Sequence, residues 1–312
     1  MSVAALWTAV PEVRGTDTLT RREVVRPGMC GHNSLFVGQV GDWTWDAVSA
    51  LCGVDALRAT DPSGAPTYLS FYYYRVRGSR RFHLRTPSFG DRLWVTSRLF
   101  DFGSESILTL HRITPDGAGP KGNEGNDSID VDEFYRFADP DCLYVENFNR
   151  WISRGTAGSN KNLVRASPVG FRHRHLPDLP ERYSPRAACH QARTGLSFLD
   201  PAGYRPEGPQ WTVDYEVDIS RDLNGVGLLY FASYFALVDW ALLRFWRDSS
   251  RLRVLVTYSV FASKWYWRTA PRCAGRGLKR NPPKLLRNAV RRRNPTSGLK
   301  LSSTAVRSTR KP

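Results

Sequence analysis

Two short turns carry polar groups that could stabilise a negatively charged oxygen. Residues 30–33 (CGHN) and 222–225 (DLNG) each precede an apolar stretch. Backbone N–H groups at the start of a helix have no partner within the helix and lie at the positive end of its dipole. His32, Asn33 and Asn224 add side-chain donors, and one such donor can contribute about 2.7–4 kcal/mol to holding an oxyanion. Both turns are therefore candidate catalytic segments.

Simpler structural roles remain open for the same residues. Asparagine commonly caps helices and closes turns, so Asn33 and Asn224 could do only that. His32 could likewise be a structural hydrogen-bonding group in its turn. The two glycines, Gly31 and Gly225, are expected to bind substrate by bringing backbone amides close to it.

The elements that must position these turns follow from the pattern of apolar residues. Helical spacing over 41–52 predicts a helix. Runs that are rich in aromatic and β-branched residues, or that alternate in polarity, predict strands at 67–78, 90–100 and 106–113. The last two strands are expected to pair across the short turn between them. Residues 131–138 fit another strand or a turn of helix.

The first half has the order of glycine turn, long helix and antiparallel strands, and a turn followed by a helix recurs in the second half of the chain. An alternating strand over 213–219 leads to the second turn and then to an apolar helix. The two helical stretches share an Asp-Trp pair, at Asp42 and Asp239. This pattern predicts an α+β double hot-dog fold, in which two curved antiparallel sheets each wrap a central helix. The predicted boundaries are 1–138 for the first unit, 139–210 for a proline-rich linker, 211–261 for a truncated second unit and 262–312 for a disordered basic tail.

The basic charge is concentrated near the C-terminus. The 312 residues include 45 Lys and Arg against 29 Asp and Glu, a formal net charge of +16. Residues 249–312 hold 17 of the basic residues and none of the acidic ones, which leaves 28 basic and 29 acidic residues before them. The body of the chain therefore lacks the surplus positive charge that binds phosphate backbones, which argues against a nucleic-acid partner.

Other features narrow the class of protein. The longest apolar run, 226–243, is interrupted by Ser233 and Asp239, so no membrane span is predicted. The first residues have no basic cluster before an apolar stretch and do not resemble a secretion signal. Five scattered cysteines without C-x-x-C spacing argue against a disulfide framework and a zinc site. We expect a cytoplasmic protein that binds no metal.

Two hypotheses account for the residues after about 250. This segment is rich in Arg, Pro and Ser and has little apolar periodicity, so burial cannot offset its ordering entropy. A basic tail could bind polyanions. Alternatively, the native reading frame is lost near residue 250, because every acidic residue disappears where the second unit should continue. The second hypothesis implies a damaged chain whose activity is in question.

Several long segments resemble one known family. Residues 26–53, 66–78, 89–113, 144–154 and 218–246 are similar to the bifunctional acyltransferase/decarboxylase of the leinamycin polyketide pathway and its relatives. The resemblance covers about residues 20–248. It implies an enzyme that takes methylmalonyl-CoA, removes CO2 and leaves propionyl on the phosphopantetheine thiol of an acyl carrier protein, without a cofactor. The resemblance is also compatible with a homodimer of two such chains.

The resemblance also implies an active-site tyrosine, because Tyr68 lies where that residue falls in the family. The tyrosine would accept the acyl group or hydrogen-bond the enolate. A phenol with an ordinary pKa of about 10 is a poor nucleophile, which favours the hydrogen-bonding role. Strand alternation would place Tyr72 and Tyr74 on the same face as Tyr68. Without the resemblance, Tyr68 would be interpreted as a strand residue that packs on the helix.

A CoA substrate and a hydrolytic alternative suggest further residues. The phosphates of CoA call for basic groups, and Lys161 and Arg165 are available in the predicted linker. The H-x-H spacing at 173–175 lacks an evident third metal ligand. Hot-dog thioesterases and dehydratases use a carboxylate or a His–Asp pair at the central helix, so the enzymatic alternative is a thioesterase or dehydratase that acts on acyl-CoA or acyl-carrier substrates. The candidate general bases for it are Asp42, Glu105 and Asp239, each of which could instead be a paired structural acid.

Overall fold

A large antiparallel sheet dominates the structure. The computed structural model describes residues 10–116, 128–154, 163–195, 213–245, 258–261 and 298–301. The large sheet contains β1 (Glu12–Arg14), β2 (Thr18–Val24), β3 (Thr67–Arg77), β4 (Arg92–Asp101), β5 (Ser106–Pro115), β6 (Leu143–Arg154), β7 (Leu163–Arg165) and β9 (Tyr258–Phe261). Its strands follow the order β1-β2-β4-β5-β6-β3-β9, and β7 pairs with β6. The strands predicted at 67–78, 90–100 and 106–113 are confirmed, as is the pairing of the last two.

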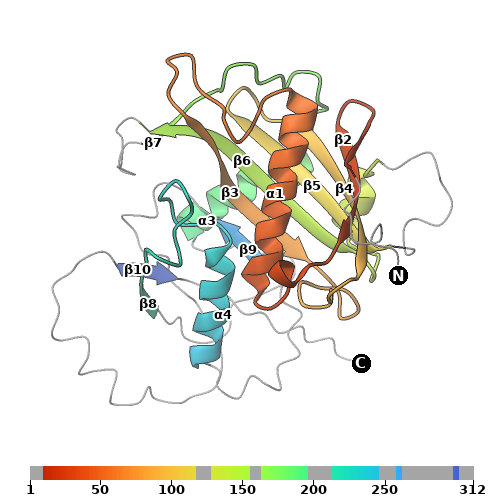
Figure 1. The fold of residues 1–312 in the computed structure, drawn as a ribbon, viewed down its shortest axis with the longest axis vertical. Helices are drawn as coiled ribbons and strands as arrows, with labels where there is room; N and C mark the ends of the chain where they lie inside the picture. The colour runs from red at the N-terminus through yellow and green to blue at the C-terminus, as the bar shows by residue number, and fades with distance from the viewer. Residues whose placement is uncertain are drawn as a thin grey trace.

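One long helix lies across the concave side of this sheet (Figure 1). Helix α1 spans Asn33–Cys52 and ends at Gly53, which has the left-handed backbone conformation typical of a helix C-terminus. The helix begins eight residues before the predicted start at 41. Gly38 and Gly41 weaken the helical signal, yet both are required, because a Cβ at either position would collide with an aromatic side chain of the second half of the chain.

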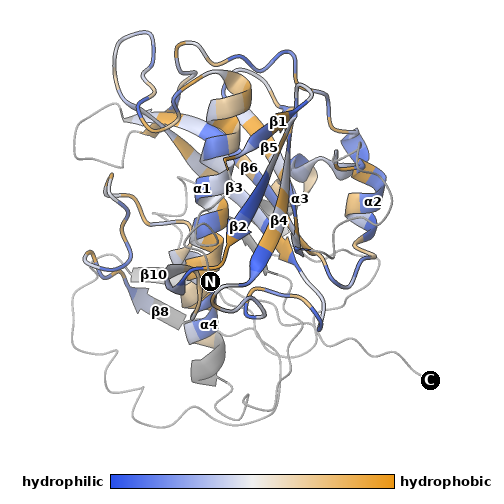
Figure 2. Ribbon diagram, turned by 45° about the vertical axis from the view of Figure 1, so that its right-hand side comes forward, coloured by the Kyte–Doolittle hydropathy of each residue, from blue (hydrophilic) through white to orange (hydrophobic). Residues whose placement is uncertain are grey.

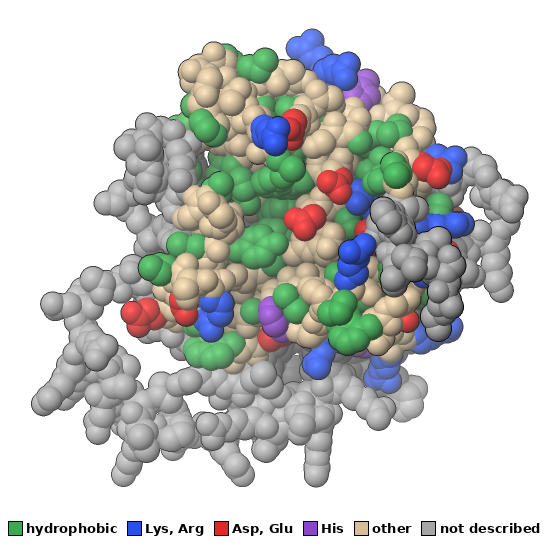
Figure 3. Space-filling model, viewed as in Figure 1, with side chains coloured by type: hydrophobic (Ala, Val, Ile, Leu, Met, Phe, Trp, Pro, Cys, Tyr) green, Lys and Arg blue, Asp and Glu red, His purple; other side chains and the backbone are tan. Residues whose placement is uncertain are grey.

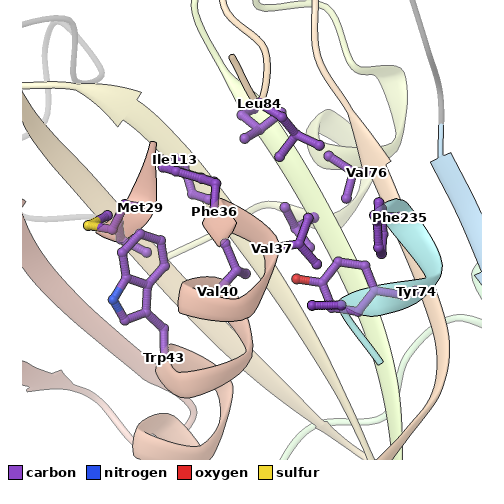
Figure 4. Packing of buried hydrophobic residues seen from close by; sticks show 14 of the residues in the cluster. Met29, Phe36, Val37, Val40, Trp43, Tyr74, Val76, Leu84, Ile113 and Phe235 are labelled. Atoms are coloured by element: carbon purple, nitrogen blue, oxygen red, sulfur yellow. The ribbon is translucent and has the colours of Figure 1, made fainter. Parts of the chain in front are cut away.

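The helix and the sheet meet in an apolar core. Phe36, Val37, Val40 and Trp43 of α1 pack against strand residues such as Ile113, and Figure 4 shows these side chains converging between the two layers. Figure 2 shows apolar and polar residues interspersed along α1 and the strands. Burial of this kind of surface is the main stabilising contribution to the fold.

A polar network is enclosed within this core. Thr44 of α1 bonds His111 of β5, with 2.9 Å between Oγ1 and Nε2, and the other ring nitrogen of His111 lies 2.8 Å from Ser97 Oγ. Asn147 Nδ2 donates to Thr44 Oγ1 over 3.0 Å. All four side chains are buried, so each depends on these partners for the hydrogen bonds that water would otherwise supply.

A β-bulge changes the face of the tyrosines in β3. The register with β6 shifts between Phe71 and Tyr73. As a result Tyr74 packs in the core beneath α1, whereas Tyr72 belongs to a cluster with Phe148 on the other face of the sheet. The expectation that Tyr72 and Tyr74 share a face is wrong, because an extra residue in a strand reverses the alternation that follows it.

The predicted linker over 139–210 is wrong for its first part. Within this range β6 lies in the middle of the large sheet, paired with β3 on one side and β5 on the other. The proline-rich composition that suggested a linker begins only after β6. The opposite face of the sheet is covered by α2 (Val131–Arg136), which resolves the open prediction for 131–138 as a helix, and by α3 (Pro185–Gly195).

The second half contributes a helix and three short strands to the described structure. Helix α4 (Ser233–Phe245) packs beside α1, and β9 after it pairs with β3, so the two halves share one sheet edge. Strand β8 (Val213–Glu216) pairs with β10 (Gly298–Leu301). Strand β10 lies in the range 262–312 predicted to be disordered, and the remainder of that range lies outside the described residues. No helix among the described residues is both long and apolar enough to cross a membrane.

Candidate functional site

Tyr68 at the start of β3 meets a loop from the second half of the chain. Asn224 Nδ2 donates a hydrogen bond of 2.9 Å to the Tyr68 hydroxyl, although 156 positions separate the two residues. On its other side the Tyr68 ring contacts Trp45 of α1 edge-on, with 4.9 Å between ring centroids. The structure thus brings together two of the four predicted catalytic residues.

The Asn224 side chain also closes its own turn. Its Oδ1 atom accepts hydrogen bonds from the backbone N–H of Val226, at 3.2 Å, and of Leu228, at 2.9 Å. The amide oxygen therefore has the predicted turn-closing role, whereas the nitrogen donates to Tyr68. Gly227, and not Gly225, supplies the left-handed residue of the turn, with φ 71°. Gly225 is exposed and nothing lies within 4 Å of the position of a Cβ.

Asp222 fixes this loop in place. Its buried carboxylate accepts from the Tyr215 hydroxyl at 2.7 Å and from the Asp218 backbone N–H at 2.9 Å, and Arg221 forms an ion pair with it at 3.1 Å. Its backbone oxygen accepts from the N–H of Tyr230 at 2.8 Å. These bonds hold both Asn224 and Tyr230 in the same rigid loop.

Tyr230 reaches α1 at a glycine. A Cβ on Gly38 would lie 2.8 Å from the Tyr230 hydroxyl oxygen, so only glycine permits this approach. Asp42 is one helical turn after Gly38, and Trp45 follows three residues later. Residues spaced by three or four positions share one face of a helix. Asp42 therefore lies between the contact with Tyr230 and the contact with Tyr68.

The pKa values of Tyr68, Tyr230 and Asp42 are all raised, and the charge of Asp42 acts on both phenols. Burial and, to a smaller degree, the charge of Asp42 raise the pKa of Tyr68 to about 12, against the opposing effect of the Asn224 bond. Burial, followed by the charges of Asp42 and Tyr68, also raises the pKa of Tyr230. Partial burial, and then the charge of Asp46, raise the pKa of Asp42, although the residue as a whole is exposed. Both phenols consequently keep their protons at neutral pH.

Tyr68 packs against a small apolar cluster. The cluster consists of Ile152 of β6, Leu163 of β7 and Leu228 of the loop. Viewed from the side of α1, the surface is hollowed near its centre and hydrophobic side chains line the hollow (Figure 3). A group bound there would be shielded from water, which strengthens hydrogen bonds to it.

The first predicted turn lies away from Tyr68. His32 precedes α1, and its ring bonds Ser34 at the helix start. It is 13 residues before Trp45, which corresponds to about 20 Å along the helix. Asn33 Nδ2 donates to Asp239 of α4 at 2.7 Å and so ties the two helices together. Gly31 is exposed, with φ 127°. The structure does not bring this turn to the Tyr68 hydroxyl.

Of the two predicted CoA-binding residues, Arg165 and Lys161, the structure describes only Arg165. Arg165 pairs with Ile152 in the sheet, and Ile152 pairs with Tyr68, so Arg165 is two strands, or about 10 Å, from Tyr68. Its exposed guanidinium contacts Glu105 at 3.3 Å. Lys161 lies outside the described residues. Within the described part of the chain, no three His, Cys, Asp or Glu side chains are grouped as metal ligands.

Sequence reasoning missed Tyr230 and Trp45. Tyr230 stands in an apolar run and Trp45 in an apolar helix, where an aromatic residue usually indicates core packing. The signal that could have found Tyr230 is its position six residues after Asn224, at the end of the same turn.

A long helix with a curved antiparallel sheet wrapped around it defines an α+β hot-dog fold. Residues 20–201 match the model of the family described as "LnmK N-terminal Hot Dog Fold domain". The match covers more than half of the chain, and the chain belongs to this family. The resemblance found in the sequence is confirmed, and the matched range runs through β6. Family membership supports an acyl-thioester enzyme.

Solved structures with related folds were also found. A 12:0-ACP thioesterase from Umbellularia californica is 10% identical and has a TM-score of 0.37, with 74% of this chain and 75% of that chain covered. An acyl-ACP thioesterase from Bacteroides thetaiotaomicron is 10% identical and has a TM-score of 0.39, with 75% and 76% covered. Both TM-scores are below 0.5 and carry no information about substrate or activity. No curated protein matched the sequence.

Proposed function

We propose that the protein decarboxylates methylmalonyl-CoA and passes the propionyl group to the phosphopantetheine thiol of an acyl carrier protein. The bond between Asn224 and Tyr68 is the observation that carries this proposal. Loss of CO2 from a malonyl-type thioester leaves its electron pair in an enolate, whose oxygen must be held by preorganised donors in a dry pocket. Tyr68 stands in such a surrounding, among Ile152, Leu163 and Leu228.

The geometry favours Tyr68 as a hydrogen-bond donor. Its oxygen accepts from Asn224, so its own proton is available for the thioester oxygen. A pKa raised to about 12 keeps the phenol protonated and makes it a poor nucleophile. In this proposal Tyr68 holds the enolate oxygen and Asn224 fixes the direction of the Tyr68 proton. The acyl group then passes directly from CoA to the carrier thiol, which attacks the thioester carbonyl as the CoA thiol leaves.

Positive charge near the hollow fits a CoA ester. Arg165 is exposed about 10 Å from Tyr68 in the same row of the sheet, and it would contact a CoA phosphate. Lys161, four residues earlier, is the second candidate. These contacts bind and orient the substrate without touching the reacting atoms.

The test is incubation of the full chain with methylmalonyl-CoA and a phosphopantetheinylated carrier protein. Mass spectrometry of the carrier should show addition of propionyl, and released CO2 should match it in amount. Free acid without acylated carrier would contradict the proposal.

Asp42 supports a second candidate, a thioesterase. Its carboxylate has no hydrogen-bond or ion-pair partner among the described residues and lies between two phenols. Such a group could activate water to hydrolyse a thioester at Tyr68. Hydrolysis of propionyl-CoA that is abolished by Asp42→Asn would favour this alternative. The third possibility, a frame-damaged inactive chain, would show neither product.

A further inference from the structure

We propose that Tyr230 is the proton donor that converts the enolate to the propionyl thioester. This inference rests on the proposed decarboxylation. Once CO2 has left, carbon 2 of the enolate must receive a proton, and a donor on one face of the enolate would make that step stereospecific. Tyr68 and Asn224 are occupied with the oxygen, so the donor must be a separate group beside them.

The position of Tyr230 fits this step. Its hydroxyl oxygen lies against Gly38, where a Cβ would come within 2.8 Å. That contact places the hydroxyl on the face of α1 that also carries Asp42 and, next to Tyr68, Trp45. Tyr230 and Tyr68 therefore contact the same face of α1, and they are close enough for the charge of Tyr68 to act on Tyr230.

The hydroxyl is also available for a ligand. Tyr230 makes no side-chain hydrogen bond to any described residue, although its ring packs edge-on against Phe231 at 4.9 Å between centroids. Its backbone N–H is bonded to Asp222, which holds the loop. A fixed backbone with an unused hydroxyl is the arrangement expected of a group kept for substrate. The raised pKa of the phenol means that it carries its proton when the enolate forms.

The bond between carbon 2 and the carboxylate breaks, its electron pair moves into the enolate, and CO2 leaves. Carbon 2 then takes the proton of Tyr230, and the enolate returns to a thioester carbonyl. The resulting phenolate regains a proton from solvent, and the neighbouring Asp42 carboxylate disfavours the phenolate and so promotes this return. No oxidant, reductant or further reactant is needed.

The experiment follows the configuration of the product. The full chain is incubated in D2O with methylmalonyl-CoA and carrier protein, and the configuration of the CHD carbon in the propionyl group is determined. The wild type should give one configuration. Tyr230→Phe removes only the unused hydroxyl, so it should still release CO2 but give a mixture of configurations, because solvent then protonates both faces.

A second variant and a control complete the test. Gly38→Ala pushes the Tyr230 hydroxyl aside and should also give a mixture. Tyr74→Phe removes a buried hydroxyl in the neighbouring core and should leave one configuration. A single unchanged configuration from Tyr230→Phe would overturn the role of Tyr230 while leaving the decarboxylation intact. Absence of CO2 from the wild type would instead contradict the proposed function and this role with it.

Discussion

Two groups of polar side chains lie on opposite sides of α1 and use their hydrogen-bonding atoms differently. On the sheet side, Thr44, His111 and Ser97 are buried and bonded to one another. On the other side, Asp42 is exposed and the Tyr230 hydroxyl lies against Gly38, and neither side chain has a hydrogen-bond partner among the described residues. Residues 42 and 44 are about 200° apart around the helix, so one element separates the two groups.

The difference supports a structural role for the first group and fits the ligand-binding role proposed for the second. A buried polar atom without a partner costs free energy, so a network that serves the fold is expected to satisfy itself. Groups that bind a ligand must instead leave donors unused until it arrives. Tyr68 has one hydrogen bond within the fold and one donor left for a ligand. Its oxygen accepts from Asn224, and its own proton is available.

The largest expected effect is the loss of the Tyr68 hydroxyl. Tyr68→Phe should lower the rate of CO2 release about 10²–10³-fold, as for removal of one oxyanion donor. Because Asn224 remains bound to its own turn, the fold should stay intact, and thermal unfolding will check this. An unchanged rate would remove Tyr68 from the site.

The second largest expected effect is a loss of stability at low pH, caused by His111 of the buried network. Burial, and then the charge of Arg21, lower the pKa of His111 from 6.5 to about 3. Between these two values the unfolded chain binds a proton that the folded chain does not, so stability is lost as the pH falls through this window. The loss from this group should be about 2 kcal/mol between pH 7 and pH 5. Urea unfolding of His111→Gln should show a smaller loss over the same interval; an equal loss would show that His111 is not the cause.

A smaller effect separates the two roles of Asn224. Asn224→Asp keeps an oxygen for the N–H groups of Val226 and Leu228 but loses the donor to Tyr68. The rate of CO2 release should fall about tenfold, the equivalent of one hydrogen bond. The melting temperature should change little. A large drop in melting temperature would mean that Asn224 acts mainly through the turn.

The smallest effect comes from Asn149 of β6. It is fully buried, and neither amide atom has a hydrogen-bond partner in the part of the chain that the structure describes. Asn149→Leu should therefore raise the free energy of unfolding by about 1 kcal/mol. Asn147→Leu, the matched change at a residue bonded to Thr44, should lower it. The comparison between the two groups would lose its basis if both variants were destabilised equally.

The strands could be predicted from the sequence better than the contacts between segments that are far apart in the chain. Strands such as β4 and β5 were predicted because their apolar and β-branched residues form short runs on either side of a turn. The first two turns of α1 were not, because Gly38 and Gly41 serve contacts with residues about 190 positions away. The linker was misplaced for a similar reason, because β6 finds its partners only in the folded sheet.

Only part of the candidate site could be predicted from the sequence, because its residues meet through packing between distant segments. Tyr68 and Asn224 were each identified, Tyr68 through the family resemblance and Asn224 through its turn. Their direct contact depends on packing between the two halves of the chain, which no local pattern reports. Tyr230 carries no local signal beyond its closeness to Asn224, and His32 was chosen for a helix start that lies about 20 Å from Trp45 along α1.

The most direct test of the account is a double-mutant cycle between Tyr68→Phe and Asn224→Asp, measured as the rate of CO2 release from methylmalonyl-CoA. The account holds that one segment from each half of the chain forms a single oxyanion site. It predicts that the double variant is less impaired than the product of the two single effects, with a coupling of at least about 0.5 kcal/mol. Effects that multiply without coupling would show that the two residues act independently and would contradict the account.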